Sequence, residues 1–155
     1  MAKIFKEIIN IIFVILIIVL LGYFILRISG RLEIYNVKTG SMEDNIHVND
    51  YILIYKKSDY NVGDIVTFKK DNYLVTHRII KKDNSKFVTK GDANNTEDEE
   101  ISINNIVGKV IIIGGLLNFI INYKFVLVSL LLSLYLLSWY FDSIKSEEKK
   151  IDEER

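Results

Sequence analysis

The chain has 155 residues, with 20 acidic and 20 basic side chains, two histidines, and neither cysteine nor proline. The zero formal net charge and the lack of a basic stripe with interleaved aromatics give no reason to expect a nucleic-acid partner. Without cysteine, disulfide bonds and thiol catalysis are excluded. This length allows one modest domain, and the apolar residues are concentrated near the two ends of the chain.

The first expected element is an apolar helix from Ile8 to Leu26. Such a helix would reach about 28 Å, close to the thickness of the hydrocarbon core of a bilayer. Lys3 and Lys6 would also fit a cleavable signal peptide. However, the apolar run exceeds the ~7–15 residues of such a segment, and no small-x-small cleavage site follows it. We therefore predict that residues 1–31 form an uncleaved membrane anchor.

Residues 32–113 have a different pattern, in which apolar residues form short runs or alternate with polar ones between Gly, Asn and Asp clusters. This pattern is typical of strands and turns, and about 80 residues can bury a small β core. We expect a β-rich domain over this range, with strands at Val48–Tyr55, Ile65–Lys69, Tyr73–Lys81, Lys86–Lys90 and Ile106–Ile113.

The last expected element lies in residues 114–155. An apolar run from Phe125 to Phe141 is interrupted only by serines and ends near the interfacial pair Trp139 and Tyr140. Its length is at the lower limit for a membrane span, so we predict a C-terminal transmembrane helix followed by a short charged tail. Residues 114–124 could either lie flat on the membrane or extend this span.

Two spans would place both termini on one side of the membrane. Lysines in the C-terminal tail favour cytoplasmic termini, whereas Arg27 and Arg31, just after the first helix, weigh against this orientation. We predict an integral membrane protein with an extracytoplasmic β domain. The small size and biased composition favour a bacterial plasma membrane.

Two segments contain candidate nucleophile and base residues. In the segment from Thr39 to Met42, Ser41 follows a glycine, and a serine in such a turn can present an exposed hydroxyl and an unobstructed N–H. A Gly-Ser pair is also a common turn element. His77 lies in a predicted strand on the same face as Val75 and Ile79, where it is either a core histidine or a general base.

The acidic segment from Gly91 to Glu100 is either a solvated loop or a source of a carboxylate that orients His77. Asp92, Asn94 and Thr96 resemble the start of a calcium-binding EF-hand loop. The position that requires glycine holds Glu97 and the bidentate position holds Ile103, so we reject an EF-hand. Two histidines without cysteine also make zinc improbable, and we predict neither a metal nor a cofactor.

Four segments, taken in order behind a membrane anchor, resemble signal peptidase I, in particular its endoplasmic-reticulum, archaeal and SipW-like branch. They are a Ser-Gly-Ser-Met-type box, a Gly-Asp strand box, a His-Arg box and a Gly-Asp-Asn-Asn box with a further aspartate. Here these are Thr39 to Met42, Gly63 to Phe68, His77-Arg78 and Gly91 to Asp98. The resemblance implies a mainly β fold, a small signal-peptidase-type catalytic domain flanked by two transmembrane helices.

By this resemblance, Ser41 attacks the scissile carbonyl, His77 accepts its proton, and Asp98 orients the imidazole. Asp92 is a second candidate for the orienting role. The Ser41 N–H and the Thr39 hydroxyl would stabilise the oxyanion.

The family further implies cleavage of signal peptides from exported precursors at small-x-small sites at the bilayer. The expected partners are these precursors and the lipid bilayer, and the sequence leaves open whether accessory membrane subunits are needed. Ile52 and Ile54 could line the shallow apolar pockets, although core packing would also explain them. Two departures from the family pattern are Asp44, where proline is usual, and Asn49, where glycine is usual. The alternative interpretation is a catalytically inactive, membrane-anchored β scaffold.

Overall fold

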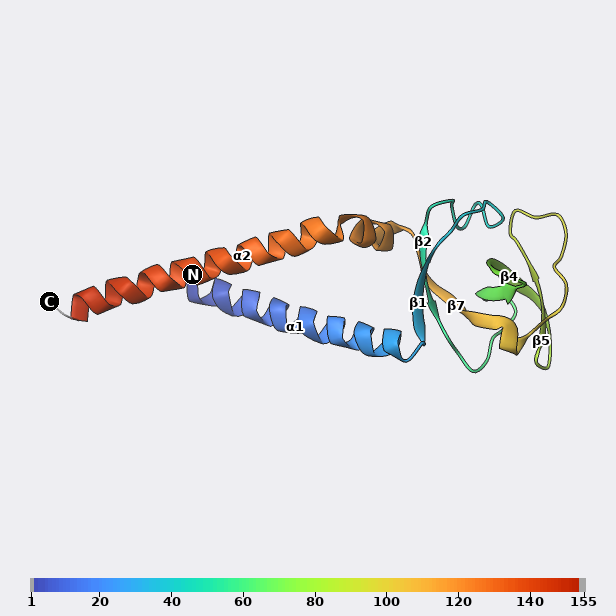
Figure 1. Cartoon of the computed structure of the whole chain (residues 1–155), viewed down its shortest axis with the longest axis horizontal. Coiled ribbons are helices and arrows are strands. Elements are labelled where there is room, and N and C mark those ends of the chain that lie inside the picture. Colours follow the sequence, from blue (N-terminus) through green and yellow to red (C-terminus); the bar gives the residue numbers. More distant parts are fainter. Residues whose placement is uncertain (1, 154–155) are drawn as a thin grey trace. The chain divides into compact units, whose positions relative to one another are not determined.

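The computed structural model describes residues 2–153, and along the chain it contains one long helix, then the strands of a β-sheet, then a second long helix (Figure 1). Helix α1 spans Ala2–Ile28 and helix α2 spans Gly115–Glu153. The strands are β1 (Leu32–Asn36), β2 (Tyr51–Tyr55), β3 (Ile65–Lys70), β4 (Tyr73–Asp83), β5 (Lys86–Lys90), β6 (Ile101–Ser102) and β7 (Ile106–Ile113), with a short 3₁₀ helix at Ile103–Asn105. The predicted mainly β fold with two flanking helices is confirmed.

The seven strands form one antiparallel sheet in the order β1-β2-β7-β3-β4-β5-β6. All five predicted strands are present, and β1 and β6 are additional short strands at the two edges. Strand β2 begins at Tyr51, later than the predicted Val48, because Asn49 has a positive φ of 72° and the Asp50 carboxylate accepts the His47 N–H. This turn ends the segment that contains Ser41.

Two buried hydrophobic clusters stabilise the sheet. The first consists of Tyr60, Val66, Phe68, Ile79, Phe87 and Ile106. The second consists of Met42, Ile46, Ile52, Ile54 and Val110. Because Ile52 and Ile54 alternate with half-buried neighbours along β2, their side chains share one face of the sheet. The second cluster therefore packs the segment around Met42 against β2 and β7.

Both helices have an 18-residue or longer apolar stretch that is long enough to cross a membrane, at Glu7–Ile28 and Gly115–Ser146. Helix α1 ends in a Schellman motif, in which Gly30 has a φ of 65° and its N–H donates to the Arg27 carbonyl. Residues 115–124 belong to α2, so this ambiguous segment extends the second helix rather than forming a separate element.

The first turn of α2 is bonded to the loop before β2. The Asn118 side chain accepts the Tyr51 N–H at 2.7 Å and donates to Asp50 Oδ1 at 2.7 Å. Gly114 lies so close that a Cβ there would approach Asp50 Oδ1 to 2.8 Å. These contacts connect the start of α2 to the end of the segment that contains Ser41.

Candidate active site

Ser41 lies in the irregular segment between β1 and β2. The two ends of this segment are joined by the Val37 N–H, which donates to the Asp50 carbonyl at 2.8 Å. The buried side chains of Met42 and Ile46 attach its middle to the second hydrophobic cluster. Ser41 itself remains partly accessible. The Ser41 hydroxyl is thus presented from a turn whose two ends are hydrogen-bonded to each other and whose middle is packed against the core.

The structure explains both departures from the family pattern. Asp44 has a φ of 79°, a value that proline cannot adopt because its ring holds φ near −65°. Asn49 has a φ of 72°, in the left-handed region that asparagine tolerates better than most residues and glycine adopts freely. At residue 44 the backbone of this turn therefore has a conformation that the proline usual in the family could not adopt. At residue 49 asparagine replaces the usual glycine without changing the sign of φ that the turn needs.

His77 is placed by the regular pairing of β4 with β3, opposite Val66. Its side chain is buried beside Phe68, with the ring centroids 6.2 Å apart in an edge-to-face arrangement. Its Nε2 atom lies 3.1 Å from Ser41 Oγ. His77 is thus packed in the core and also faces the candidate nucleophile, and its role as a base stays a prediction.

Asp98 lies against the other side of the imidazole. Its Oδ2 atom is 2.5 Å from His77 Nδ1 and also accepts the Thr89 hydroxyl at 2.7 Å, while its N–H donates to the Thr89 carbonyl at 2.8 Å. A carboxylate at Nδ1 favours the tautomer with the proton on that nitrogen, which leaves the Nε2 lone pair toward Ser41. Ser41, His77 and Asp98 thus form one continuous hydrogen-bonded row.

Thr89 was missed by sequence reasoning, although it is fully buried and fixes the Asp98 carboxylate. A signal was present in the alternation along β5, which places Thr89 on the same face as the buried Phe87. A threonine on a buried face requires a hydrogen-bond partner, and the following acidic loop supplies it.

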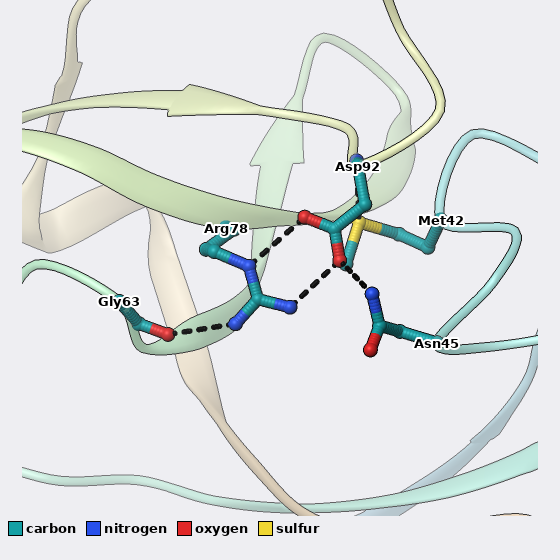
Figure 2. A network of polar contacts seen from close by, with 5 residues as sticks. All are labelled: Met42, Asn45, Gly63, Arg78 and Asp92. Carbon is teal, nitrogen blue, oxygen red and sulfur yellow. Dashed lines mark hydrogen bonds and ion pairs between the residues drawn. The ribbon is translucent and has the colours of Figure 1, made fainter.

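Asp92 contacts a different set of groups (Figure 2). Its Oδ1 accepts Arg78 Nε at 2.9 Å, and its Oδ2 accepts Arg78 Nη2 at 2.7 Å and the Asn45 amide at 2.8 Å. Arg78 also donates to the Gly63 carbonyl at 3.0 Å. The hydrogen bonds from Arg78 hold the pKa of Asp92 below its usual value, and the same contacts raise the pKa of Arg78. Asp98, rather than Asp92, therefore contacts the imidazole.

The loop that begins at Gly91 supports the Ser41 segment directly. The Ala93 N–H donates to the Ser41 carbonyl at 3.0 Å, and the Asp92 N–H points to Met42 Sδ at 3.4 Å. A Cβ on Gly91 would lie only 2.5 Å from the Ser41 carbonyl oxygen. Glycine is required here because the two backbones approach too closely for any side chain.

A cleft of about 590 Å³ opens beside Ser41 and His77. Thr39 and Ile52 line it, whereas Ile54 does not and is buried in the second hydrophobic cluster. Residues 73–76 of β4 also line the cleft. Over these residues β4 pairs with β3 alone, because its pairing with β5 begins at Arg78. The cleft therefore has an unpaired strand edge along one wall.

The second histidine, His47, lies apart from this row. It is exposed and bonds through Nδ1 to Glu43 Oε2 at 2.7 Å, a contact that raises the pKa of His47 and lowers that of Glu43. Within residues 2–153, no group of three or more His, Asp or Glu side chains is placed to hold a metal ion. The row itself consists of a hydroxyl, an imidazole and a carboxylate.

Comparison with known proteins finds similarity to signal peptidases. The family model described as "Signal peptidase, peptidase S26" matches residues 5–111. The signal peptidase complex catalytic subunit SEC11 of Metarhizium acridum (strain CQMa 102) is 32% identical over 74 residues, which are 42% of this chain and 43% of that protein. The corresponding subunit of Metarhizium robertsii is 31% identical over the same lengths.

The matched part thus spans less than half the length of these curated relatives. The similarity confirms the predicted resemblance to signal peptidase I. The predicted bacterial plasma membrane gains no support from it, because both relatives are from Metarhizium.

Proposed function

Because the chain belongs to the signal peptidase family, peptidase S26, we propose that it is a membrane-bound serine endopeptidase that removes signal peptides from exported precursors. The observation that carries this proposal is the row of hydrogen bonds from Ser41 Oγ through His77 to Asp98, with distances of 3.1 and 2.5 Å. A nucleophile, a base and a group that orients the base are the parts that serine-dependent acyl transfer requires.

In this mechanism Ser41 Oγ attacks the scissile carbonyl carbon while its proton moves to His77 Nε2. Asp98 keeps the imidazole in the correct tautomer and stabilises the imidazolium that forms. The imidazolium then protonates the departing amine, which leaves an acyl-enzyme on Ser41. A water molecule, deprotonated by the same imidazole, hydrolyses the ester and restores the serine.

The oxyanion would be stabilised by the Ser41 N–H and the Thr39 hydroxyl. Within the described part of the chain the Ser41 N–H has no hydrogen-bond partner, and Thr39 lines the cleft beside it. One such donor typically lowers the activation free energy by ~3–4 kcal/mol. Asp92 is given a positioning role, because its carboxylate joins Arg78, adjacent to His77, to the Ser41 segment through Asn45.

The cleft supports binding of an extended peptide. The unpaired edge of residues 73–76 can form a backbone ladder with a substrate strand, and alternate substrate side chains would then face the cleft. Ile52, buried at the wall of the cleft, would limit the depth of the side-chain pocket and favour small residues. These features fit small-x-small cleavage sites.

Anchoring in the membrane keeps Ser41 near the bilayer, where the signal peptide of a precursor also lies. Even fully extended, the chain from Leu26 to Ser41 could carry the serine no more than roughly 50 Å from the first span. We assign cytoplasmic termini, two spans and an extracytoplasmic β domain. Since the two relatives are named as subunits of a complex, accessory membrane subunits are proposed partners beside the precursor and the bilayer.

The test is coexpression of the full chain with a precursor that has an Ala-x-Ala site. Ser41→Ala and His77→Ala should abolish processing, whereas Ser85→Ala and His47→Ala, which replace an exposed serine and an exposed histidine outside the row, should process at the wild-type rate. If all four variants process the precursor equally, the chain is instead a non-catalytic β scaffold. Immunoblots of precursor and mature forms distinguish the two functions.

A further inference from the structure

A basic hollow lies where the chain leaves α1 and enters the sheet. It has a volume of about 660 Å³, and its lining includes Arg31, Lys56 and Lys57, together with the polar residues Ser58 and Asn61. We call it the Arg31 hollow. It is separate from the cleft beside Ser41, with which it shares no residue.

The backbone holds the three cations of this hollow close together. The Schellman motif that ends α1 places Arg31 directly after Gly30, with the Arg31 N–H bonded to the Leu26 carbonyl at 3.1 Å. The Arg31 carbonyl in turn accepts the Lys56 N–H at 2.8 Å, which continues the β1–β2 ladder by one pair. Arg31 and Lys56 are therefore neighbours across two strands, and Lys57 follows.

The protein compensates the positive charge of the hollow only in part, through Asp59, which lies in the lining and interacts electrostatically with Lys57. Among residues 2–153, none of the three cations forms an ion pair. The one carboxylate in the lining, Asp59, is bonded to Lys82 at 2.8 Å, and Glu33, near Lys56 on its other side, accepts the Tyr35 hydroxyl. Like charges placed side by side repel one another, and an anion between them would remove that repulsion.

The position of the hollow relative to α1 indicates which anion is available. Arg31 is the third residue after Ile28, where the first candidate span ends, so its Cα lies within about 10 Å of the end of the apolar helix. The headgroup layer of a bilayer extends about 5–7 Å beyond each side of the hydrocarbon core. The Arg31 side chain is therefore within reach of the lipid phosphates when α1 spans the membrane.

We infer that the Arg31 hollow binds the phosphate of an anionic lipid headgroup through Arg31, Lys56 and Lys57. This role accounts for basic residues directly after the first helix, where the charge rule for membrane orientation disfavours them in the proposed topology. The inference rests on the location of α1 in a bilayer, which the proposed function shares, and does not depend on peptidase activity.

The experiment uses the full chain purified in a neutral detergent and incubated with equal concentrations of phosphatidylglycerol and phosphatidylcholine. Native mass spectrometry counts the lipids that remain bound. The wild type should retain phosphatidylglycerol at least fivefold over phosphatidylcholine. Arg31→Gln/Lys56→Gln should lower that ratio to about one, because it removes two of the three charges and leaves the backbone bond between these residues intact.

Lys81→Gln/Lys86→Gln is the matched control, since it removes two exposed charges on β4 and β5 that are paired with Glu97 and Glu100 of the following loop. It should retain the wild-type ratio, as should Ser41→Ala, whose behaviour separates lipid binding from catalysis. An unchanged ratio in the Arg31→Gln/Lys56→Gln variant, or an equal loss in the control, would overturn the inference. Displacement of the lipid by millimolar inorganic phosphate would also overturn it, by identifying a free phosphate site.

Discussion

The two sides of the candidate active site are positioned in different ways. His77 occupies a regular strand, where its backbone is set by continuous pairing of β4 with β3 from Lys70↔Tyr73 to Ile65↔Arg78. Ser41 occupies an irregular segment that depends on a few long-range contacts, chiefly those to the Gly91 loop and the burial of Met42 and Ile46. A strand position is thus secured by many equivalent bonds, whereas the nucleophile depends on a few individual ones.

One loop supports both sides. Its beginning, Gly91 and Asp92, contacts the Ser41 segment, and its end, Asp98, contacts the imidazole. The comparison therefore predicts that substitutions within this short loop have separable effects. Changes at Asp98 should alter catalysis with little effect on folding, and changes at Gly91 or Asp92 should alter the position of the nucleophile.

The largest effect is expected for Asp98→Asn, which keeps the size of the side chain but cannot hold the imidazole in the same tautomer. We expect kcat to fall about 10³–10⁴-fold, with little change in unfolding temperature. Precursor cleavage by the purified enzyme measures this, with Glu99→Gln, an exposed carboxylate next in sequence, as the control. A near-normal kcat for Asp98→Asn would remove this aspartate from the mechanism.

Cleavage by the wild type should also decline as the pH is lowered, because a protonated imidazole cannot accept the Ser41 proton. A rate that stays constant through the acid range would contradict the role of His77 as a base.

A smaller effect is expected for Gly91→Ala, which tests the close approach of the Gly91 backbone to the Ser41 carbonyl. The added Cβ would lie 2.5 Å from the Ser41 carbonyl oxygen, so the Ser41 segment must shift. We expect a loss of about 1–3 kcal/mol in stability and about 10²-fold in kcat, because small displacements of reacting groups are costly.

Gly22→Ala is the matched control for that substitution, because a Cβ at Gly22 meets nothing within 4 Å. Wild-type stability and rate in both alanine variants would show that the Ser41 segment does not depend on this contact.

The smallest effect is expected for Asp92→Asn, which weakens the bonds to Arg78 and Asn45. Arg78 is about a third exposed, so solvent screening reduces the contribution of the pair, and we expect a loss of about 1–2 kcal/mol near neutral pH. Since folding lowers the pKa of Asp92, the ionised form stabilises the folded state above its unfolded pKa, roughly 3.9.

That contribution should disappear as the pH falls through the lowered pKa, so the stability difference between wild type and Asp92→Asn should shrink in acid. Chemical denaturation at several pH values measures it. Glu97→Gln, which breaks the exposed pair with Lys81, should change stability little at any pH. A difference for Asp92→Asn that grows in acid would contradict the assigned pair.

Sequence patterns were sufficient for much of the fold. The alternation of apolar residues predicted five strands, and the apolar runs predicted both long helices. The edge strand β6 was missed because its two residues contain too few alternations to be recognised. The edge strand β1 was also missed, although it is as long as the predicted β5. The start of β2 was misplaced because the turn at Asn49 and Asp50 depends on side-chain hydrogen bonds rather than on periodicity.

For the site, the sequence by itself determined which residue types are present and in what order: a serine beside glycine, a histidine on a buried strand face and a loop with two aspartates. It could not decide which aspartate contacts the imidazole, or that Thr89 and Gly91 take part in holding the site. Only the tertiary structure decided this, because the path of the 91–98 loop across β4 and β5 places Asp92 on Arg78 and Asp98 on His77. Local propensity acts over a few residues, whereas these contacts join residues that are distant in the chain and meet only when the sheet has formed.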